Sequence, residues 1–124
     1  MYKQLTPVLI VDAIEPVLPL WDALGFQRTA EVPHEDRLGF VILTAGPVEI
    51  MYQTRASASA DIPAAAHAGT SCLFLTVGSL DAVEPLLPPD TEVLERRRKT
   101  FYGAMETIVR DAMGNLVTFA QMGS

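Results

Sequence analysis

Apolar residues along this chain follow first the pattern of a β-strand and then the pattern of an amphipathic helix, and this succession occurs twice. Residues 5–11 are rich in aliphatic and β-branched side chains, which predicts a β-strand. The spacing of an amphipathic helix follows, with apolar side chains on one face at Ile14, Val17, Leu18, Trp21 and Leu24. Trp21 is therefore expected in the core, and Gly25 is a natural stop for the helix.

Polar residues and prolines mark the start of this helix. Asp12 is expected to cap it, and Glu15, three residues later, resembles a capping box. Proline fits freely only in the first turn of a helix, so Pro19 is expected to kink this helix or to delay its start. Pro85 occupies the matching position of the repeat described below, so the second helix is expected to share the distortion.

Shorter apolar runs predict the remaining strands of the first half, over residues 26–32, 38–44 and 48–53. A turn is expected over residues 33–36, which include His34. Residues 55–70 are rich in alanine and serine and show no strand pattern. They are expected to form a linker, with a short helix at residues 63–67 that includes His67.

Nearly the same sequence returns in the second half. Residues 9–20 (LIVDAIEPVLPL) are similar to residues 75–86 (LTVGSLDAVEPL), and a period of about half the chain indicates two copies of one supersecondary unit. In the second copy, Ser79 is expected to cap a helix, and strands are predicted over residues 72–77, 92–100, 104–110 and 116–120. The predicted fold class is α+β, a single domain over residues 1–124 with tandem βαβββ units at residues 1–54 and 71–124.

Composition and charge exclude several classes of protein. The formal net charge of −6 argues against nucleic acid as a partner, and it either serves solubility or mildly favours cationic ligands. The sequence has no apolar run of about 18 residues, so no membrane partner is expected. Its first residues also lack the pattern of a signal peptide. Cys72 is the single cysteine and cannot form an internal disulfide, which favours a cytoplasmic protein.

One basic run occupies residues 96–99 (RRRK). Side chains of a strand alternate between its two faces, so no continuous basic patch is expected here. Charged edge strands protect a sheet against aggregation, and this is the main interpretation of the run. An anion-binding site is the alternative.

The paired units and two short motifs resemble the vicinal oxygen chelate superfamily, which includes glyoxalase I, extradiol dioxygenases, and fosfomycin- and bleomycin-resistance proteins. The motifs are Leu24-Gly25-Phe26 after the first helix, and Asp111-x-x-Gly114-Asn115 before the last strand with Tyr102-Gly103 ahead of it. Residues 7–12 (PVLIVD) are most similar to the bleomycin-resistance type. The resemblance implies a curved mixed sheet around a cavity, and units that exchange or pair across a homodimer.

Enzymes of this superfamily hold a divalent metal with a histidine on each unit's first strand and a carboxylate on each last strand. The resemblance places at these positions Leu5, Cys72, Glu49 and Thr118. Only Glu49 matches, because Leu5 has no lone pair, a threonine hydroxyl is a poor ligand, and Cys72 with Glu49 falls short of a site. We therefore expect no metal and no cofactor.

Alternation along the strands, combined with the resemblance, places one set of side chains in the cavity. The expected ligand-binding residues are Glu49, Met51, Cys72, Phe74, Tyr102, Thr118 and Leu5. Pro7 and Leu9 are expected beside Leu5 on one wall, whereas Tyr52 packs on the helix. Tyr102 either stacks on a ligand at the rim or covers an edge.

Glu49 is the single carboxylate of this mostly apolar pocket. It anchors a cationic ligand, acts as a general base if burial raises its pKa, or is paired with Arg37 or Arg110. The resulting hypothesis is sequestration of a small cationic or aromatic molecule without turnover, as in antibiotic resistance. The alternatives are a metal-dependent lyase, isomerase or dioxygenase of the same superfamily, and a structural or regulatory module. Nucleophilic catalysis by Cys72 is a minor alternative.

Overall fold

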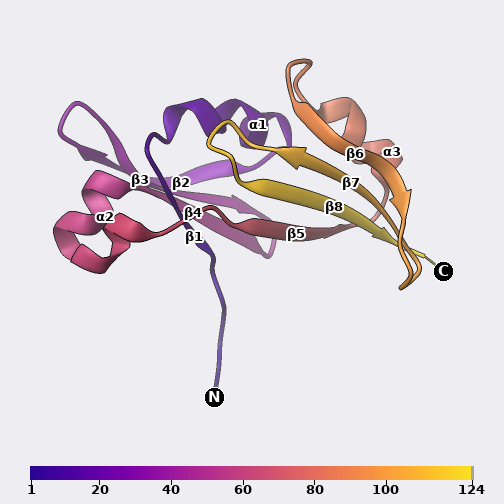
Figure 1. Ribbon diagram of the computed structural model, residues 1–124, viewed down its shortest axis with the longest axis horizontal. Helices are drawn as coiled ribbons and strands as arrows, with labels where there is room; N and C mark the ends of the chain where they lie inside the picture. The colour runs from indigo at the N-terminus through magenta and orange to yellow at the C-terminus, as the bar shows by residue number, and fades with distance from the viewer. Residues whose placement is uncertain (124) are drawn as a thin grey trace. The chain divides into compact units, whose positions relative to one another are not determined.

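Two four-stranded sheets, one in each half of the chain, form the framework of the protein (Figure 1). The computed structural model describes residues 1–123. Its contacts divide the chain into a first unit, Met1–Thr70, and a second unit that begins at Ser71. Each unit has the predicted order of strand, helix and three strands, so the α+β fold class with two βαβββ units is confirmed. Within residues 1–123, no helix combines the length and the hydropathy that a membrane crossing requires.

The first sheet has the strand order β1-β4-β3-β2. Its strands are β1 (Val8–Val11), β2 (Gln27–His34), β3 (Arg37–Ala45) and β4 (Val48–Thr54). β1 pairs with β4 in parallel, and the other pairs are antiparallel. The first strand begins at Val8 and not at residue 5 as expected. Pro7 accepts one bond, from Met51 N at 3.0 Å, but has no N–H with which to extend the ladder.

The turn between β2 and β3 is shorter than the sequence predicts. Pro33 and His34 belong to β2, so the prediction that His34 lies in a turn is wrong. A proline is tolerated here because β2 is an edge strand, whose outer N–H groups have no ladder partner. The backbone reverses just after His34, where Glu35 has a φ of 59°.

The first helix begins late because of its prolines. A 3₁₀ helix, η1 (Glu15–Val17), precedes α1 (Leu18–Ala23), which has Pro19 in its first turn, so the expected delay is confirmed. The expected cap at Asp12 is wrong, because the N-cap residue of η1 is Ile14 and no side chain caps it. The Glu15 carboxylate instead accepts a hydrogen bond of 2.8 Å from the backbone N–H of Leu38 on β3.

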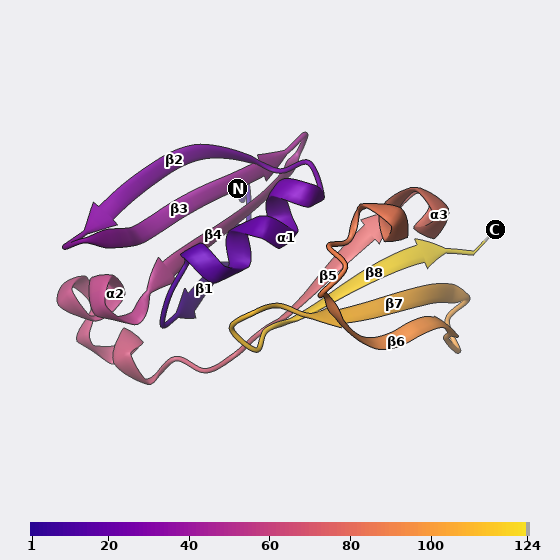
Figure 2. The same cartoon turned by 90° about the horizontal axis from the view of Figure 1, so that it is seen from above.

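The core of the first unit lies between α1 and one face of its sheet (Figure 2). Trp21 is fully buried, as predicted, and donates a hydrogen bond of 2.9 Å to the hydroxyl of Tyr52. Phe26 packs edge-to-face on the Trp21 ring. Leu9 pairs with Tyr52 in the parallel register and is buried on this same side. The prediction that Leu9 lines the cavity wall is therefore wrong, and its neighbours Val8 and Ile10 occupy the other side.

The segment expected as a linker contains two helices that pack within the first unit. They are α2 (Arg55–Asp61) and the 3₁₀ helix η2 (Pro63–His67), and the latter lies where a short helix is predicted. The Arg55 guanidinium ties this segment down through the carbonyl oxygens of Ala66 and Ala68, at 3.0 and 2.8 Å. It also forms an ion pair with Asp12.

The second sheet has the strand order β5-β8-β7-β6 and repeats the pairing of the first. Its strands are β5 (Cys72–Val77), β6 (Glu92–Lys99), β7 (Ala104–Arg110) and β8 (Leu116–Met122). The helical segment is α3 (Leu80–Val83) followed by the 3₁₀ helix η3 (Glu84–Leu86), which has Pro85 in its first turn. The expected sharing of the proline distortion is confirmed. Ser79 is the N-cap residue of α3 but caps it with no side-chain bond, and the Leu80 N–H donates instead to the Gln121 side chain.

The turn between β7 and β8 is held by two buried polar side chains. The Asp111 carboxylate accepts hydrogen bonds from the backbone N–H groups of Met113 and Asn115, at 2.9 and 2.8 Å. The Asn115 amide donates to Asp111 and accepts a bond of 2.7 Å from the N–H of Ser71, which precedes β5. This motif therefore fastens the first strand of the unit to the turn before its last strand.

Candidate functional site

The side of the first sheet opposite α1, here called the first open face, is mostly apolar. The strand register places on it Val8, Ile10, Phe40, Ile42, Met51, Gln53 and Glu49. Met51 and Glu49 share this face because Tyr52 and Ile50 are buried toward α1, as the alternation predicts. Val8 remains 45% exposed, and the other apolar side chains of the face are half-buried. An apolar face with one carboxylate is suited to an amphipathic ligand.

Glu49 has neutral hydrogen-bond partners and no ion pair among the described residues. The side chains of Gln4 and Thr6 both donate to its Oε1 oxygen at 3.0 Å. Arg37 donates instead to the carbonyl of Asp12, and Arg110 pairs with Glu92, so the interpretation of Glu49 as the partner of either arginine is wrong. Its negative charge is therefore available to a cationic group.

Leu5 lies in the segment before β1 and is 89% exposed. It stands between Gln4 and Thr6, the two residues whose side chains bond to Glu49. The structure thus places Leu5 in the segment next to the first open face but not on a strand of it. Its expected contact with a ligand stays a prediction.

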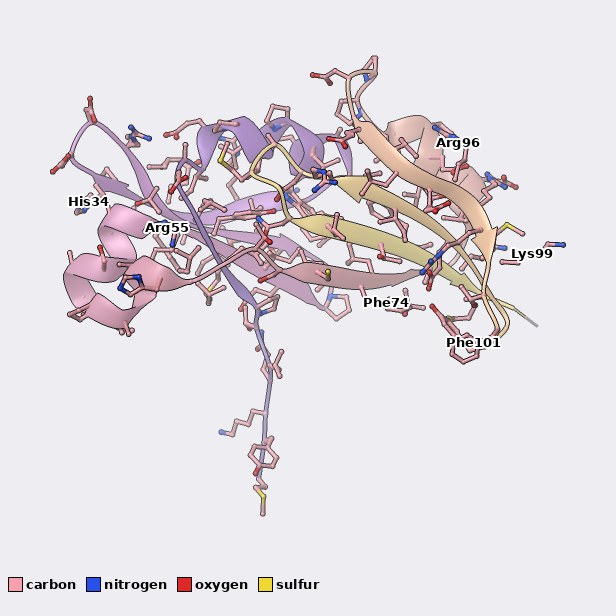
Figure 3. The ribbon with its side chains drawn as sticks, in the orientation of Figure 1. His34, Arg55, Phe74, Arg96, Lys99 and Phe101 are labelled. Carbon is pink, nitrogen blue, oxygen red and sulfur yellow. The ribbon has the colours of Figure 1, made fainter. Side chains whose placement is uncertain are left out.

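The side of the second sheet opposite α3, here called the second open face, carries the other predicted residues. Register pairs place on it Cys72, Phe74, Thr76, Thr118, Ala120, Ile108 and Glu106. The next residues along these strands point to the other side of the sheet. Thr107, next to Glu106, donates to Glu84 of η3, and Gln121, next to Ala120, accepts from the Leu80 N–H of α3. Phe74 is 56% exposed and points away from α3, on the same side as the hairpin residue Phe101 (Figure 3).

A buried carboxylate on this face was not predicted from the sequence. Glu106 has a side chain only 1% exposed, and its Oε1 accepts hydrogen bonds from Arg98 Nε and Nη2 at 3.0 and 2.8 Å. Its other oxygen accepts a hydrogen bond from the Tyr102 hydroxyl. The sequence held one sign of it: Glu106 is the single charged residue of AMETIV (residues 104–109), whose other side chains are apolar or carry a hydroxyl. Tyr102 thus lies over the second open face, with Phe101 edge-to-face on its ring.

A bulge in β6 decides which arginine reaches this carboxylate. The register slips between Glu95 and Arg98, and Arg97 has a φ of 54°. Arg96 and Arg97 consequently both pair with Glu84, on the side of α3, while Arg98 turns to Glu106. The prediction that the basic run is split between two faces of an edge strand is confirmed.

Hydrogen bonding keeps Glu106 ionised. The Tyr102 hydroxyl bond and the Arg98 guanidinium lower the pKa of Glu106, and they outweigh burial, which raises it. The same bond raises the pKa of Tyr102. A carboxyl whose pKa is lower in the folded than in the unfolded protein stabilises the fold above the unfolded value of about 4.3. This contribution is lost as the pH falls through the folded value.

We therefore expect Glu106→Gln to have a smaller loss of stability in acid than the wild type. Urea unfolding should be followed at several pH values between about 6 and 3, where carboxyl groups titrate. The slope of unfolding free energy against pH should be smaller for the variant, because one carboxyl with a lowered pKa is gone. Glu92→Gln, on an exposed pair, is the control. Equal slopes for wild type and Glu106→Gln contradict this role of the carboxylate.

The residues present do not fit the metal centre that the superfamily implies. Within residues 1–123, no three histidine, cysteine or acidic side chains gather to hold an ion. Leu5 has no donor atom and precedes its strand, and Thr118 offers a neutral hydroxyl. Glu49 is bonded to an amide and a hydroxyl.

Solved structures with this arrangement identify the fold. No family model matches the chain, and a search of curated proteins finds no match. A glyoxalase/bleomycin resistance protein/dioxygenase from Nocardioides superposes with a TM-score of 0.78 at 12% identity, covering 100% of this chain and 86% of that one. The chain has the fold of the vicinal oxygen chelate superfamily.

Other proteins with the vicinal oxygen chelate fold represent both binding and catalysis. A bleomycin-binding protein complexed with bleomycin matches with a TM-score of 0.67 at 16% identity, covering 97% of this chain and 98% of that one. A lactoylglutathione lyase from Agrobacterium tumefaciens matches with a TM-score of 0.77 at 15% identity, covering 96% and 92%. Because one scaffold hosts both, the fold alone does not decide the function of a protein that has it.

Proposed function

We propose that this protein binds a small amphipathic molecule with a cationic or aromatic group, non-covalently and without turnover. The observation that carries the proposal is Glu49, a carboxylate without an ionic partner among the described residues, on a mostly apolar sheet face. A cationic group would pair with Glu49, while the apolar part of the ligand would lie along Met51 and Ile42. In the first unit the residues proposed to take part in binding are Glu49, Met51 and Leu5. In the second unit, considered by itself, the residues proposed to contact a ligand are Cys72, Phe74, Tyr102 and Thr118.

Sequestration agrees with the chemistry that these residues can supply. It needs a shaped apolar surface and one charge, whereas the reactions of the superfamily need a metal that these side chains do not fit. The bleomycin-binding neighbour supports this use of the fold, and bleomycin itself is a suitable probe. Resistance to an antibiotic is the biological role that we propose, with the cytoplasm as its place.

We also propose that the protein pairs with a second copy of itself. The support is the apolar character of the segment before β1, where Met1, Tyr2 and Leu5 are almost fully exposed. Large apolar side chains gathered in an exposed segment commonly mark an interaction surface.

The test uses two naphthalene probes that differ in charge. Calorimetric titration with 2-naphthylmethylammonium should show saturable binding, and Glu49→Gln should weaken it about five- to tenfold because a partly exposed charge pair is lost. Neutral 2-naphthalenemethanol should bind both proteins equally, since it has no charge to pair.

Glu35→Gln, which removes an equal charge at the exposed β2–β3 turn, is the matched control and should leave both affinities unchanged. Unchanged affinity of the cationic probe in Glu49→Gln removes Glu49 from the site. Conversion of a probe would favour the enzyme alternative.

A further inference from the structure

The two units can be compared position by position, because they repeat the same sheet. The row across the first sheet that contains Ile10 continues through Gln53, Phe40 and Val32. Ile10 matches Thr76 in the sequence repeat, and the row from Thr76 continues through Ala120, Glu106 and Arg98. An apolar pair of the first sheet, Phe40 and Val32, is thus an ion pair in the second. The second unit has replaced apolar contact by charge on its open face.

The fold itself does not require this charge. Burying a carboxylate costs solvation free energy that its partner must compensate, and apolar side chains of similar volume often stabilise a fold equally well. The first unit builds the same four-stranded sheet with Phe40 in place of Glu106. A charged group at a position where an apolar one suffices indicates a contact beyond the fold.

The guanidinium of Arg98 is only partly used by Glu106. Two of its N–H groups, on Nε and Nη2, donate to one carboxylate oxygen. A guanidinium has five N–H donors, so the edge formed by Nη1 and Nη2 keeps donors for a second planar acceptor. The Arg98 side chain is 50% exposed, and Glu106 holds it in place. Glu95 is the other carboxylate near it.

Aromatic side chains lie on the second open face together with the Arg98 guanidinium. Tyr102 is fixed by its hydroxyl bond to Glu106, and Phe101 packs on its ring at 5.1 Å between centroids. Phe74 projects from β5 on the same side of the sheet (Figure 3). Strands lie about 4.8 Å apart, so the face from β6 to β5 is about 14 Å wide, enough for a fused aromatic ring system.

We propose that Arg98 binds the carboxylate of a small aromatic acid on the second open face. The carboxylate accepts hydrogen bonds from the Nη1 and Nη2 edge, and the ring lies against the aromatic side chains. Glu106 is a positioning residue that holds Arg98 and Tyr102. The inference goes beyond the proposed function, because it gives the second open face an anionic ligand of its own and involves none of the contacts of Glu49.

Calorimetric titration with 2-naphthoate tests the inference. Arg98→Gln should weaken binding at least about tenfold, because a charge-assisted bidentate contact is lost. Glu106→Gln should strengthen binding several-fold, because the neutral amide still accepts from Arg98 but no longer competes for its charge. Arg28→Gln, which removes an arginine paired with Asp22 in the first unit, is the control and should change nothing.

The two variants are expected to change the affinity for 2-naphthoate in opposite directions, and this distinguishes ligand binding by Arg98 from a purely structural role. If the ion pair only supports the fold, neither variant gains affinity for 2-naphthoate, whatever stability it loses. That result, or absence of naphthoate binding to the wild type, overturns the proposal. Should Arg98→Gln fail to fold, Glu106→Gln decides alone. Binding of 2-naphthylmethylammonium depends on Glu49 and not on Arg98, so the proposed function can fail or hold independently.

Discussion

Replacement of Asn115 by alanine is expected to lower the free energy of unfolding by about 2 to 4 kcal/mol. The Asn115 side chain is buried and bonds to two groups in different parts of the second unit, the N–H of Ser71 and the carboxylate of Asp111. Alanine removes both bonds: a hydrogen bond from a neutral N–H contributes about 0.5 to 1.5 kcal/mol, and one to a charged carboxylate about 1.5 to 3 kcal/mol. The expected destabilisation is the sum of these two lost hydrogen bonds, because the Asn115 amide joins the segment just before β5 to the turn before β8.

Urea unfolding followed by far-ultraviolet circular dichroism measures this loss. Ala112→Ser, at an exposed position of the same turn, is the control and should stay within about 0.5 kcal/mol of the wild type. The fluorescence of Trp21, the chain's single tryptophan, reports on the first unit. Surface substitutions usually change stability by less than about 0.5 kcal/mol. If Asn115→Ala also stays within this range of the wild type, the described role of the turn is contradicted.

Replacement of Trp21 by alanine is expected to cost about 3 to 5 kcal/mol, the range for deleting a large buried aromatic side chain. Trp21 is fully buried, contacts the Phe26 ring at 4.9 Å between centroids, and bonds to Tyr52. Tyr52→Phe keeps the packing and removes the hydroxyl that accepts the indole N–H. Its expected cost is about 1 to 2 kcal/mol, because a buried donor loses its acceptor.

Circular dichroism serves for these variants, since Trp21→Ala abolishes the tryptophan signal. Tyr2→Phe removes a hydroxyl from an almost fully exposed tyrosine and should leave stability unchanged. If Tyr52→Phe is as stable as Tyr2→Phe, the indole bond contributes nothing measurable. If Trp21→Ala costs less than about 1 kcal/mol, well below the range for such deletions, then α1 does not form the core of the first unit.

The repeat in the sequence predicted most of the fold, because each unit needs its apolar face covered by its helix. Spacing of apolar residues located α1 through Trp21, and Pro19 correctly predicted the delayed start. The ends of strands were predicted wrongly where backbone hydrogen bonding, and not the residue types, decides where a strand begins or ends. Pro7 stops the ladder despite aliphatic neighbours, and His34 continues a strand past Pro33 because that strand is at an edge.

The candidate site was predictable only in part. Alternation along β4 correctly separated Glu49 from Tyr52, since both lie within one regular strand. The partnership of Glu106 with Arg98 depends on the bulge at Arg97, which shifts the register by an amount that alternation alone does not reveal. The wrong side assigned to Leu9 has a similar cause, because the parallel register with Tyr52 is a tertiary property.

Metal-free binding of a cationic probe can be measured by calorimetric titration with 2-naphthylmethylammonium, before and after the protein is dialysed against a chelator. The metal content of the wild-type protein is determined beforehand. We expect no stoichiometric transition metal, and saturable binding that the chelator leaves unchanged and that Glu49→Gln weakens. One bound metal per chain, together with loss of probe binding after chelation, would contradict metal-free binding and support a metal-dependent enzyme.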